Sequence, residues 1–333
     1  MIAPDLPLID LHRHLDGCVR LETILDLGRQ HGLNLPAWDV ERLRPYVQVS
    51  EAQPGIMAFI ARFKWMIGVM VNADAVRRIA FENVEDLQRE GVHYAELRFS
   101  PLFMAEPHHL DPVEVIDAVV DGVRAGCQKT GVRVNLIGIL SRTYGVDACW
   151  KELRAILARR EAFVAVDLAG DEARFPGSLF VEHFKAVRDV GLHVTVHAGE
   201  AAGAESIWQA LHELGAERIG HAVHAPEDPA LMDVLAERGT GVEVNLTSNV
   251  QTTTAPSYAG HPVRQFVERG IRATLNSDDP GISGINLPYE YTVAAPAAGL
   301  TPEQIRQLQR NALEVAFLTP AEKQALMKSC QAE

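Results

Sequence analysis

The sequence predicts an α/β protein built as a (β/α)8 TIM barrel, and three observations carry this prediction. Short apolar runs rich in β-branched residues alternate with helical patterns along the chain. Most runs are almost continuously apolar, as the strands of a parallel sheet are when both faces are buried. Ionisable residues gather directly after these runs, where the C-terminal ends of barrel strands would meet. Because the chain shows no internal repeat and no flexible linker, we expect one domain spanning residues 1–333.

The runs expected to form strands number eight, as a barrel of this class requires. In chain order they read LPLIDLH, VHYAELRFS, VRVNLIGIL, FVAVDLAG, HVTVHAG, RIGHAV, GVEVNLTSN and IRATLNSDD. A doubly wound open sheet is the competing architecture, but such a sheet usually carries a glycine-rich phosphate loop after its first strand. The stretch HLDGCVRLE that follows the first run is no such loop, so the barrel is favoured.

Helical patterns fill the intervals between the later runs, at residues 111–128, 205–215 and 228–239. The first and third of these patterns begin with Asp-Pro, which places an N-cap residue before a proline at the first helical position. The third is expected to end at Gly239, since glycine commonly follows the last residue of a helix. These signals support a strand–helix alternation throughout the chain.

A long interval of about seventy residues separates the first two runs. We interpret residues 18–91 as a helical insertion that covers one end of the barrel. Its middle, FIARFKWMIGVM, places Phe59, Phe63, Ile67 and Met70 on one helical face. These side chains either pack against the barrel or form an apolar wall over the site, and we include Phe59 and Phe63 among the candidate substrate contacts.

The composition excludes several classes of protein. The chain has 44 acidic and 31 basic residues, a formal net charge of −13, which argues against a surface that binds nucleic acid. No apolar run approaches the length of a membrane span, and the N-terminus lacks the features of a secretory signal. The four cysteines are scattered, as reduced thiols of a cytoplasmic protein are. We therefore expect a cytoplasmic enzyme whose partner is a small molecule; the sequence leaves the oligomeric state open.

Histidine and carboxylate side chains at the strand ends predict a metal site. His12 and His14 are two residues apart, so they point to the same face of the first strand, while Arg13 points to the opposite face. His197 from the fifth strand and Asp278 from the eighth can complete the shell across the barrel mouth. Three imidazoles and one carboxylate suit zinc and leave room for a water molecule. Further polar residues end other strands, namely Asp167, Gly170, Asp171 and Glu172 after the fourth, Glu200 after the fifth, His221 in the sixth and Asp279 after the eighth.

The motifs LHRHLDG, DLAGDE, HAGE, RIGH and LNSDDP resemble, in order and spacing, those of the adenosine deaminase family in the amidohydrolase superfamily. The resemblance spans essentially the whole chain. It implies one zinc ion per chain and hydrolytic deamination of adenosine, and of 2′-deoxyadenosine, to the inosine product and ammonia. Two-metal relatives typically carry a lysine at the end of the fourth strand, where this chain has none. Cytidine-deaminase-type enzymes need a C-x-x-C motif, which is also missing.

The resemblance also implies roles for individual residues. His12, His14, His197 and Asp278 would hold the zinc, and Glu200, placed by HAGE at the start of the next helix, would protonate purine N1. His221 faces the attacking water, which it could orient, deprotonate or assist by stabilising charge. The substrate contacts implied for the remaining positions are the backbone N–H of Gly170 at purine N3, Asp279 near N7 and the water, and Asp16 at the ribose 5′ hydroxyl.

Two departures from the family pattern bear on the substrate. The sixth strand reads GHAVH, with Ala222 where the family usually has glycine, and an added methyl could narrow the pocket or shift His221. Asn245 in the seventh strand stands where cysteine is frequent. The alternatives left open are a deaminase of adenine, a modified adenosine or 6-aminodeoxyfutalosine, and a non-catalytic binding protein on the same barrel. His108, His109, His224 and His261 lie in expected loops, and the sequence offers them no partner.

Overall fold

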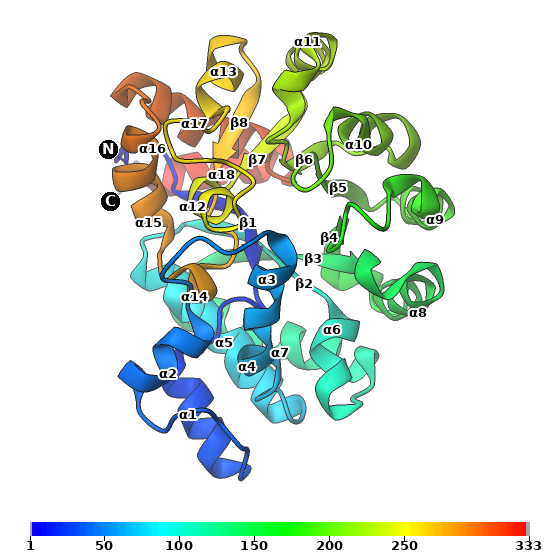
Figure 1. Ribbon diagram of the computed structural model, residues 1–333, viewed down its shortest axis with the longest axis vertical. Coiled ribbons are helices and arrows are strands. Elements are labelled where there is room, and N and C mark those ends of the chain that lie inside the picture. Colours follow the sequence, from blue (N-terminus) through cyan, green and yellow to red (C-terminus); the bar gives the residue numbers. More distant parts are fainter. Residues whose placement is uncertain (1, 331–333) are drawn as a thin grey trace.

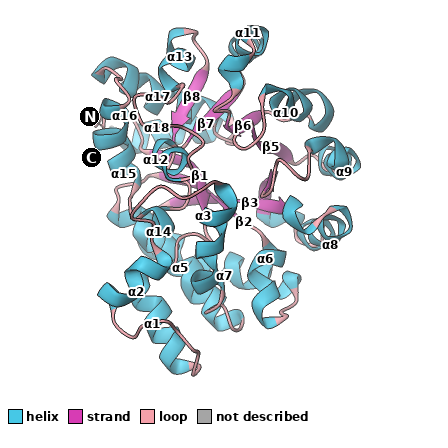
Figure 2. Cartoon of the chain, in the orientation of Figure 1, coloured by secondary structure: helices cyan, strands magenta, loops and turns pink. Residues whose placement is uncertain are grey.

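The computed structural model describes residues 2–330 and contains the barrel that the sequence predicts. Eight strands form one sheet in the order β1 to β8, each neighbouring pair is parallel, and helices surround them (Figures 1 and 2). All eight expected runs contain a strand. The strands are β1 (Ile9–His14), β2 (Tyr94–Phe99), β3 (Arg133–Ser141), β4 (Phe163–Ala169), β5 (His193–Ala198), β6 (Arg218–His221), β7 (Gly241–Val244) and β8 (Arg272–Leu275).

The barrel is closed by backbone contacts between the segment after β8 and the end of β1. The amide of His14 donates to the Asp278 carbonyl at 2.8 Å, and the amide of Asp278 donates to the His12 carbonyl at 2.8 Å. An isolated parallel bridge joins Arg13 and Asp278 at the same place. The closing seam therefore brings together two parts of the chain in which the sequence predicts metal ligands.

The helices follow the strand–helix alternation, with additional short segments. The α-helices are α1 (Leu21–Gln30), α2 (Val40–Val47), α3 (Ile56–Ile60), α4 (Lys64–Ile67), α5 (Ala73–Arg89), α6 (Pro101–Ala105), α7 (Pro112–Thr130), α8 (Val146–Leu157), α9 (Val181–Asp189), α10 (Ala204–Gln209), α11 (Pro229–Arg238), α12 (Leu246–Gln251), α13 (Val263–Glu268), α14 (Pro280–Ser283), α15 (Leu287–Tyr289), α16 (Ala295–Ala297), α17 (Pro302–Val315) and α18 (Pro320–Cys330). The 3-10 turns are η1 (Ala61–Phe63), η2 (Glu106–His108), η3 (Arg142–Tyr144), η4 (Arg160–Ala162), η5 (Gly177–Phe180) and η7 (Ala225–Glu227), and the π-helical segments are η6 (Ala210–Leu214) and η8 (Glu290–Ala294).

The helix signals in the sequence act as expected. The side chain of Asp111 accepts from the amide of Val113 at 2.9 Å, and that of Asp228 accepts from the amide of Ala230 at 2.9 Å. Gly239 ends α11 with a left-handed φ of 64°, which glycine adopts without steric cost.

Five α-helices, α1 to α5, lie between β1 and β2, and they do not all belong to the ring of helices around the barrel. The last of them, α5, packs closely on α7, because a Cβ at Gly122 would lie only 2.3 Å from the carbonyl oxygen of Arg77. It thus occupies the place of the first barrel helix. Helices α1 and α2 extend beyond the ring of barrel helices, at the lower end of the view in Figure 1.

The segment FIARFKWMIGVM differs from the single helix that its periodicity predicts. It is divided into α3, the tighter 3-10 turn η1, and α4. The division still leaves the four apolar side chains of the expected face buried, each with at most 6% of its surface exposed: Phe59, Phe63, Ile67 and Met70.

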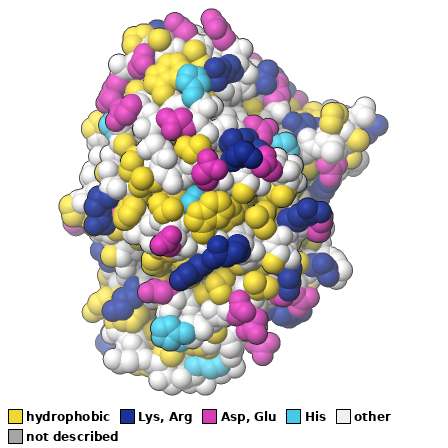
Figure 3. Space-filling view, turned by 90° about the vertical axis from the view of Figure 1, so that its right-hand side faces the viewer, with side chains coloured by type: hydrophobic (Ala, Val, Ile, Leu, Met, Phe, Trp, Pro, Cys, Tyr) yellow, Lys and Arg dark blue, Asp and Glu magenta, His cyan; other side chains and the backbone are white. Residues whose placement is uncertain are grey.

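On the face of the molecule drawn in Figure 3, charge of neither sign is concentrated, and apolar side chains are most frequent across the middle of the view. Acidic and basic side chains are interspersed there with apolar ones. Within residues 2–330, no helix is long and apolar enough to cross a membrane.

A buried carboxyl group begins the π-helical segment η8. Glu290 is fully buried, and its Oε1 accepts from the amide of Thr247 at 3.2 Å, while its Oε2 has no partner. Burial raises the pKa of Glu290 from 4.5 to about 8, because the ionised form would lose its hydration. Near neutral pH this side chain is therefore protonated in the folded protein.

Glu290→Gln is expected to make the protein more stable at pH 8 and to flatten its dependence of stability on pH. Between pH 4.5 and 8 the unfolded chain has released the Glu290 proton and the folded chain keeps it, so wild-type stability falls as pH rises. The full loss of wild-type folding free energy from this one group is on the order of 4 kcal/mol. Chemical denaturation of both proteins at pH 5, 6.5 and 8 measures it, with the exposed Glu303→Gln as control. Parallel pH profiles for wild type and Glu290→Gln would contradict the assignment.

Candidate active site

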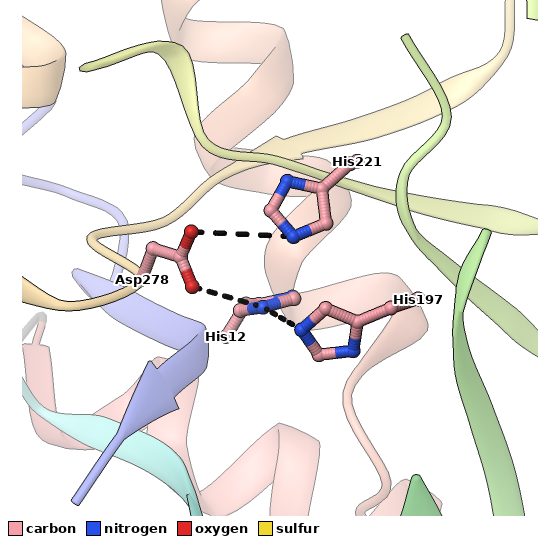
Figure 4. Close-up of side chains that lie close together, drawn as sticks. All are labelled: His12, His197, His221 and Asp278. Carbon is pink, nitrogen blue, oxygen red and sulfur yellow. Dashed lines mark hydrogen bonds and ion pairs between the residues drawn. The ribbon is translucent and has the colours of Figure 1, made fainter. Parts of the chain in front are cut away.

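Imidazole and carboxylate groups from opposite sides of the barrel converge at the C-terminal ends of its strands. The Nε2 atom of His12 lies 3.1 Å from His197 Nε2 and 3.2 Å from Asp278 Oδ1. The Nε2 atom of His14 lies 3.3 Å and 3.4 Å from the same two atoms. Figure 4 shows His12, His197, His221 and Asp278 pointing toward one another. All five side chains are buried, so bulk water does not separate them.

The hydrogen bonds of two imidazoles determine which nitrogen faces the cluster centre. Nδ1 of His12 lies 2.7 Å from Glu243 Oε2, and Nδ1 of His197 lies 2.9 Å from Asp167 Oδ2. An ionised carboxylate only accepts, so each Nδ1 carries a proton, and in the neutral form of each ring Nε2 then presents its lone pair to the cluster. Two lone pairs at 3.1 Å repel one another unless a cation lies between them.

The spacing of the donor atoms fits a metal ion. Ligands at 2.0–2.1 Å in a tetrahedral zinc shell are about 3.3 Å apart, and the four distances measured here run from 3.1 to 3.4 Å. Two overlapping groups could hold an ion, one of His12, His197, His221 and Asp278, the other of His14, Asp278 and Asp279. The donor set therefore suits a divalent metal, and His14 and His221 compete for one place in it.

A buried network of charges supports the two oriented imidazoles. Arg98 on β2 donates from one nitrogen to Asp167 Oδ2 and from the other to Glu243 Oε2, each at 2.8 Å. Arg218 donates from Nε to Glu243 Oε1 at 2.7 Å. Burial opposes ionisation of Glu243, but the two guanidinium groups outweigh it and hold the pKa of this carboxyl well below its usual range. Both carboxylates thus remain acceptors for the histidines.

Sequence reasoning missed most of this network. Asp167 is noted only as a polar strand end, and Arg98, Arg218 and Glu243 receive no role. A signal was present, because a charged residue inside an otherwise apolar strand is costly to bury unless it is paired. Arg13, in contrast, points away from the cluster as expected and forms a two-pronged ion pair with Glu90, with both distances 2.9 Å.

Adjacent carboxyl groups are separated by an unusual backbone conformation. Asp278 has a φ of 58°, a left-handed value that turns Asp279 away from it. Burial and the negative charge of Asp278 raise the pKa of Asp279 well above its usual value. Its Oδ1 is buried without a partner and lies 1.9 Å from where a Cβ at position 17 would be, so Gly17 leaves room for this carboxyl group.

Glu200 lies in a loop rather than at the start of a helix, which corrects the sequence-based expectation. Helix α10 begins only at Ala204, and the loop before it wraps around the carboxylate of Glu172. That carboxylate accepts from four successive amides, of Gly199, Glu200, Ala201 and Ala202, at 2.6 to 3.1 Å. Burial, followed by the negative charge of Asp278, raises the pKa of Glu200 well above its usual value. A protonated carboxyl group beside this cluster of histidines and Asp278 can serve as a general acid.

Two adjoining cavities lead from the barrel mouth to the cluster. The inner one, of about 60 Å³, is lined by Phe59, Phe63, Glu200, Asp278 and Asp279, among others. The outer one, of about 240 Å³, has a mainly apolar surface and shares several of its walls with the inner one. The outer lining consists of His14, Asp16, Ile60, Phe63, Ser100, Phe103, Ile139, Ser141, Thr143, Tyr144, Ala169 and Gly170. The helical insertion therefore contributes aromatic walls to the cavities.

Asp16 and Gly170 both lie in the outer cavity. Oδ2 of Asp16 accepts from the amide of Ser100 at 3.1 Å, and its buried Oδ1 has no hydrogen-bond partner but lies 3.8 Å from His14 Nδ1. Gly170 has a φ of 109°, and a Cβ there would lie 2.4 Å from Thr143 Oγ1. Only glycine can take this conformation in this space, so the backbone itself forms the cavity wall.

Further polar residues near His221 escaped the sequence analysis. His261, expected to lack a partner, is buried, accepts from the amide of Val263 at 3.0 Å and lies 3.2 Å from Asn249 Oδ1. Strand β7 ends at Val244, earlier than the expected run GVEVNLTSN suggests, and helix α12 begins at Leu246. This turn brings residue 249 toward His221.

Two other histidines that were expected to lack partners also have them. His108 Nε2 lies 2.8 Å from the carbonyl oxygen of Gly68, and His224 Nδ1 lies 2.7 Å from Glu227 Oε1. Neither residue lines the two cavities, so neither joins the site.

Of the two effects expected of the Ala222 methyl group, a narrower pocket or a shifted His221, the structure does not show the first. It is fully buried and lines neither of the two cavities. Its φ of 52° is the kind of value that glycine adopts freely and alanine adopts at a cost. Alanine in place of the usual glycine therefore places a strained backbone conformation next to His221.

The fold and the site together define a (β/α)8 barrel protein with a candidate metal centre and a buried acid at its mouth. Comparison with known proteins gives the family. The family model described as adenosine deaminase matches residues 7–333. The chain belongs to the adenosine deaminase family.

Individual relatives agree with this assignment. The chain is 59% identical to an adenosine deaminase of Vibrio parahaemolyticus serotype O3:K6, over 98% of both chains. It is 57% identical to an adenosine deaminase of Escherichia coli O1:K1 / APEC, over 100% of both chains. Among solved structures, a zinc-bound amidohydrolase from Burkhoderia ambifaria has a TM-score of 0.87 at 23% identity, covering 99% of this chain and 94% of the other.

Proposed function

We propose that this chain catalyses the zinc-dependent hydrolytic deamination of adenosine and 2′-deoxyadenosine, which gives inosine and 2′-deoxyinosine with release of ammonia. The observation that carries the proposal is the approach of His12 Nε2 and His197 Nε2 to 3.1 Å, together with the buried carboxyl group of Glu200, whose pKa burial raises. A cation site next to an acid is what hydrolytic deamination of an aminopurine needs. The adenosine deaminases at 57–59% identity support the choice of substrate.

We assign the metal to His12, His14, His197 and Asp278. The donor distances of 3.1 to 3.4 Å among these residues support this set, whereas His221 Nε2 lies 4.0 Å from Asp278 Oδ2. When bound, a zinc ion acts as a Lewis acid and brings the pKa of water near 7.

The remaining site residues bind and protonate the substrate. Glu200 donates a proton to purine N1, and Asp279 contacts the purine near N7 through its unpartnered oxygen. Asp16 accepts from the ribose 5′ hydroxyl through Oδ1, which has no hydrogen-bond partner in the protein, and the backbone N–H of Gly170 meets purine N3. Phe59 and Phe63 exclude water from the face of the ring.

The lining of the outer cavity favours a nucleoside over a nucleotide. No lysine or arginine is found among its lining residues within the described chain, and Asp16 carries a carboxylate there. A 5′-phosphate would lose its hydration without gaining a cationic partner. A different 6-aminopurine, such as adenine, a modified adenosine or 6-aminodeoxyfutalosine, remains the second candidate because Asn245 is directly beside His221.

Zinc content and substrate turnover test the proposal together. We expect about one zinc per purified chain, and loss of ultraviolet absorbance on addition of adenosine or 2′-deoxyadenosine. Adenosine 5′-monophosphate, adenine and 6-aminodeoxyfutalosine in the same assay are expected to react far more slowly. A zinc-loaded protein that prefers adenine or 6-aminodeoxyfutalosine would establish the second candidate, and one that prefers adenosine 5′-monophosphate would contradict the preference for a nucleoside. A protein that turns over neither adenosine nor any of these compounds would indicate a binding protein.

A further inference from the structure

The imidazole of His221 differs from those of His12 and His197 in the kind of group that faces its Nδ1 atom. At His12 and His197 that partner is a carboxylate, which receives the Nδ1 proton. At His221 the nearest polar atom to Nδ1 is an amide nitrogen, Asn249 Nδ2 at 3.0 Å, while Asn245 Nδ2 lies 3.3 Å from Nδ1 and 3.5 Å from Nε2. The carboxyl oxygen of Glu200 is farther away, at 3.6 Å.

The direction of the Asn249 amide can be deduced from a backbone group. The amide of Val263 can only donate, and it lies 3.0 Å from His261 Nδ1, so this nitrogen accepts. Burial lowers the pKa of His261 to about 3, so the ring is neutral and its proton is on Nε2. This Nε2 lies 3.2 Å from Asn249 Oδ1, which must therefore accept.

The amide nitrogen of Asn249 consequently faces His221. One of its hydrogens points to His221 Nδ1 and the other to Thr254 Oγ1 at 3.2 Å. If the amide were reversed, its nitrogen would meet the protonated Nε2 of His261, donor against donor. The orientation is therefore determined by a chain of hydrogen bonds that begins at the backbone of residue 263.

We propose that His261 and Asn249 are positioning residues that keep the proton of His221 on Nε2, so that His221 donates a hydrogen bond into the active site. With a proton on Nε2, the neutral ring neither binds the metal through that atom nor accepts a proton there. This leaves His14, rather than His221, to complete the metal shell with His12, His197 and Asp278. The proton position follows from the hydrogen bonds alone, and its catalytic consequence rests on the proposed function.

Nuclear magnetic resonance of protein labelled with 15N-histidine tests the proton position in the unaltered chain. We expect His221 to show an unprotonated Nδ1 and a protonated Nε2, in both metal-free and zinc-loaded protein. His12 and His197 should show the opposite pattern in the metal-free protein. The spectrum of His221→Gln identifies the His221 signals. A proton on Nδ1 of His221 in the wild type would overturn the proposal, whether or not the protein deaminates adenosine.

Asn249→Asp tests the positioning role, because it replaces the amide donor by an acceptor of the same shape. The introduced carboxylate would draw the His221 proton to Nδ1 and outweigh the more distant Asn245 amide. We expect kcat to fall about 10²-fold while KM changes much less. The absorption spectrum of the cobalt-substituted variant should also change, because His221 Nε2 becomes able to bind the metal.

Thr254→Val is the matched control. It removes a contact of the same Asn249 amide without reversing the hydrogen bonds to His221, so the proton position and kcat should be retained. Wild-type kcat and an unaltered cobalt spectrum in a folded Asn249→Asp protein would refute the positioning role. If that variant does not fold, the wild-type spectra still decide the proton position.

Discussion

Glu200→Gln is expected to lower kcat for adenosine by about 10³-fold or more while leaving the fold and the zinc content unchanged. The amide has nearly the shape of the carboxyl group, so it fits the same buried loop. It lacks the acidic proton that burial and the nearby Asp278 charge keep on Glu200. Addition of water at purine C6 would then have to proceed without protonation of N1. The measurements are kcat and KM for adenosine, zinc per chain and thermal unfolding.

The control for Glu200→Gln is Glu205→Gln, an exposed glutamate in the first turn of α10. It makes the same chemical change five residues away, and its kcat should equal that of the wild type. If Glu200→Gln retained near-wild-type kcat with zinc bound, Glu200 would not be the general acid. Loss of zinc together with activity would instead indicate that the carboxyl group supports the metal site.

The barrel could be predicted from the sequence because its strands are buried on both faces. Burial on both faces produces nearly unbroken apolar runs, and the polar residues that end such runs must meet at one edge of the barrel. His12, His14, His197 and Asp278 could be expected to meet at the barrel mouth for this reason, and the structure brings them together.

The supporting residues could not be predicted in the same way. Glu172 holds the loop of Glu200 through four backbone amides, and backbone amides leave no trace in the residue types of that loop. Asn249 reaches His221 only because β7 stops at Val244 and a helix begins at Leu246, where the sequence suggested a longer strand. The contact of His261 with Asn249 depends on that same turn. Such contacts join distant segments, so they require the three-dimensional arrangement.

Arg98→Met is expected to weaken zinc binding by about 10- to 100-fold and to destabilise the metal-free protein by about 3–5 kcal/mol. Arg98 is fully buried and joins the two carboxylates that orient His12 and His197. Methionine fills similar volume but leaves Asp167 without its arginine and Glu243 with Arg218 as its remaining guanidinium partner. Each carboxylate then ionises less readily and holds its histidine less firmly. Chelator competition measures the affinity, and thermal unfolding without metal measures stability.

Two further variants separate the orienting role of Arg98 from its charge. Arg98→Lys keeps the charge but cannot donate to both carboxylates in a fixed fork, so its zinc affinity should lie between those of wild type and Arg98→Met. Arg20→Met removes a guanidinium that pairs with Asp86 and Glu85 away from the cluster, and it should leave zinc affinity unchanged. If Arg98→Met bound zinc as tightly as the wild type, the histidines would keep their orientation without the network. The metal site would then depend on the strand ends alone, as the sequence by itself suggests.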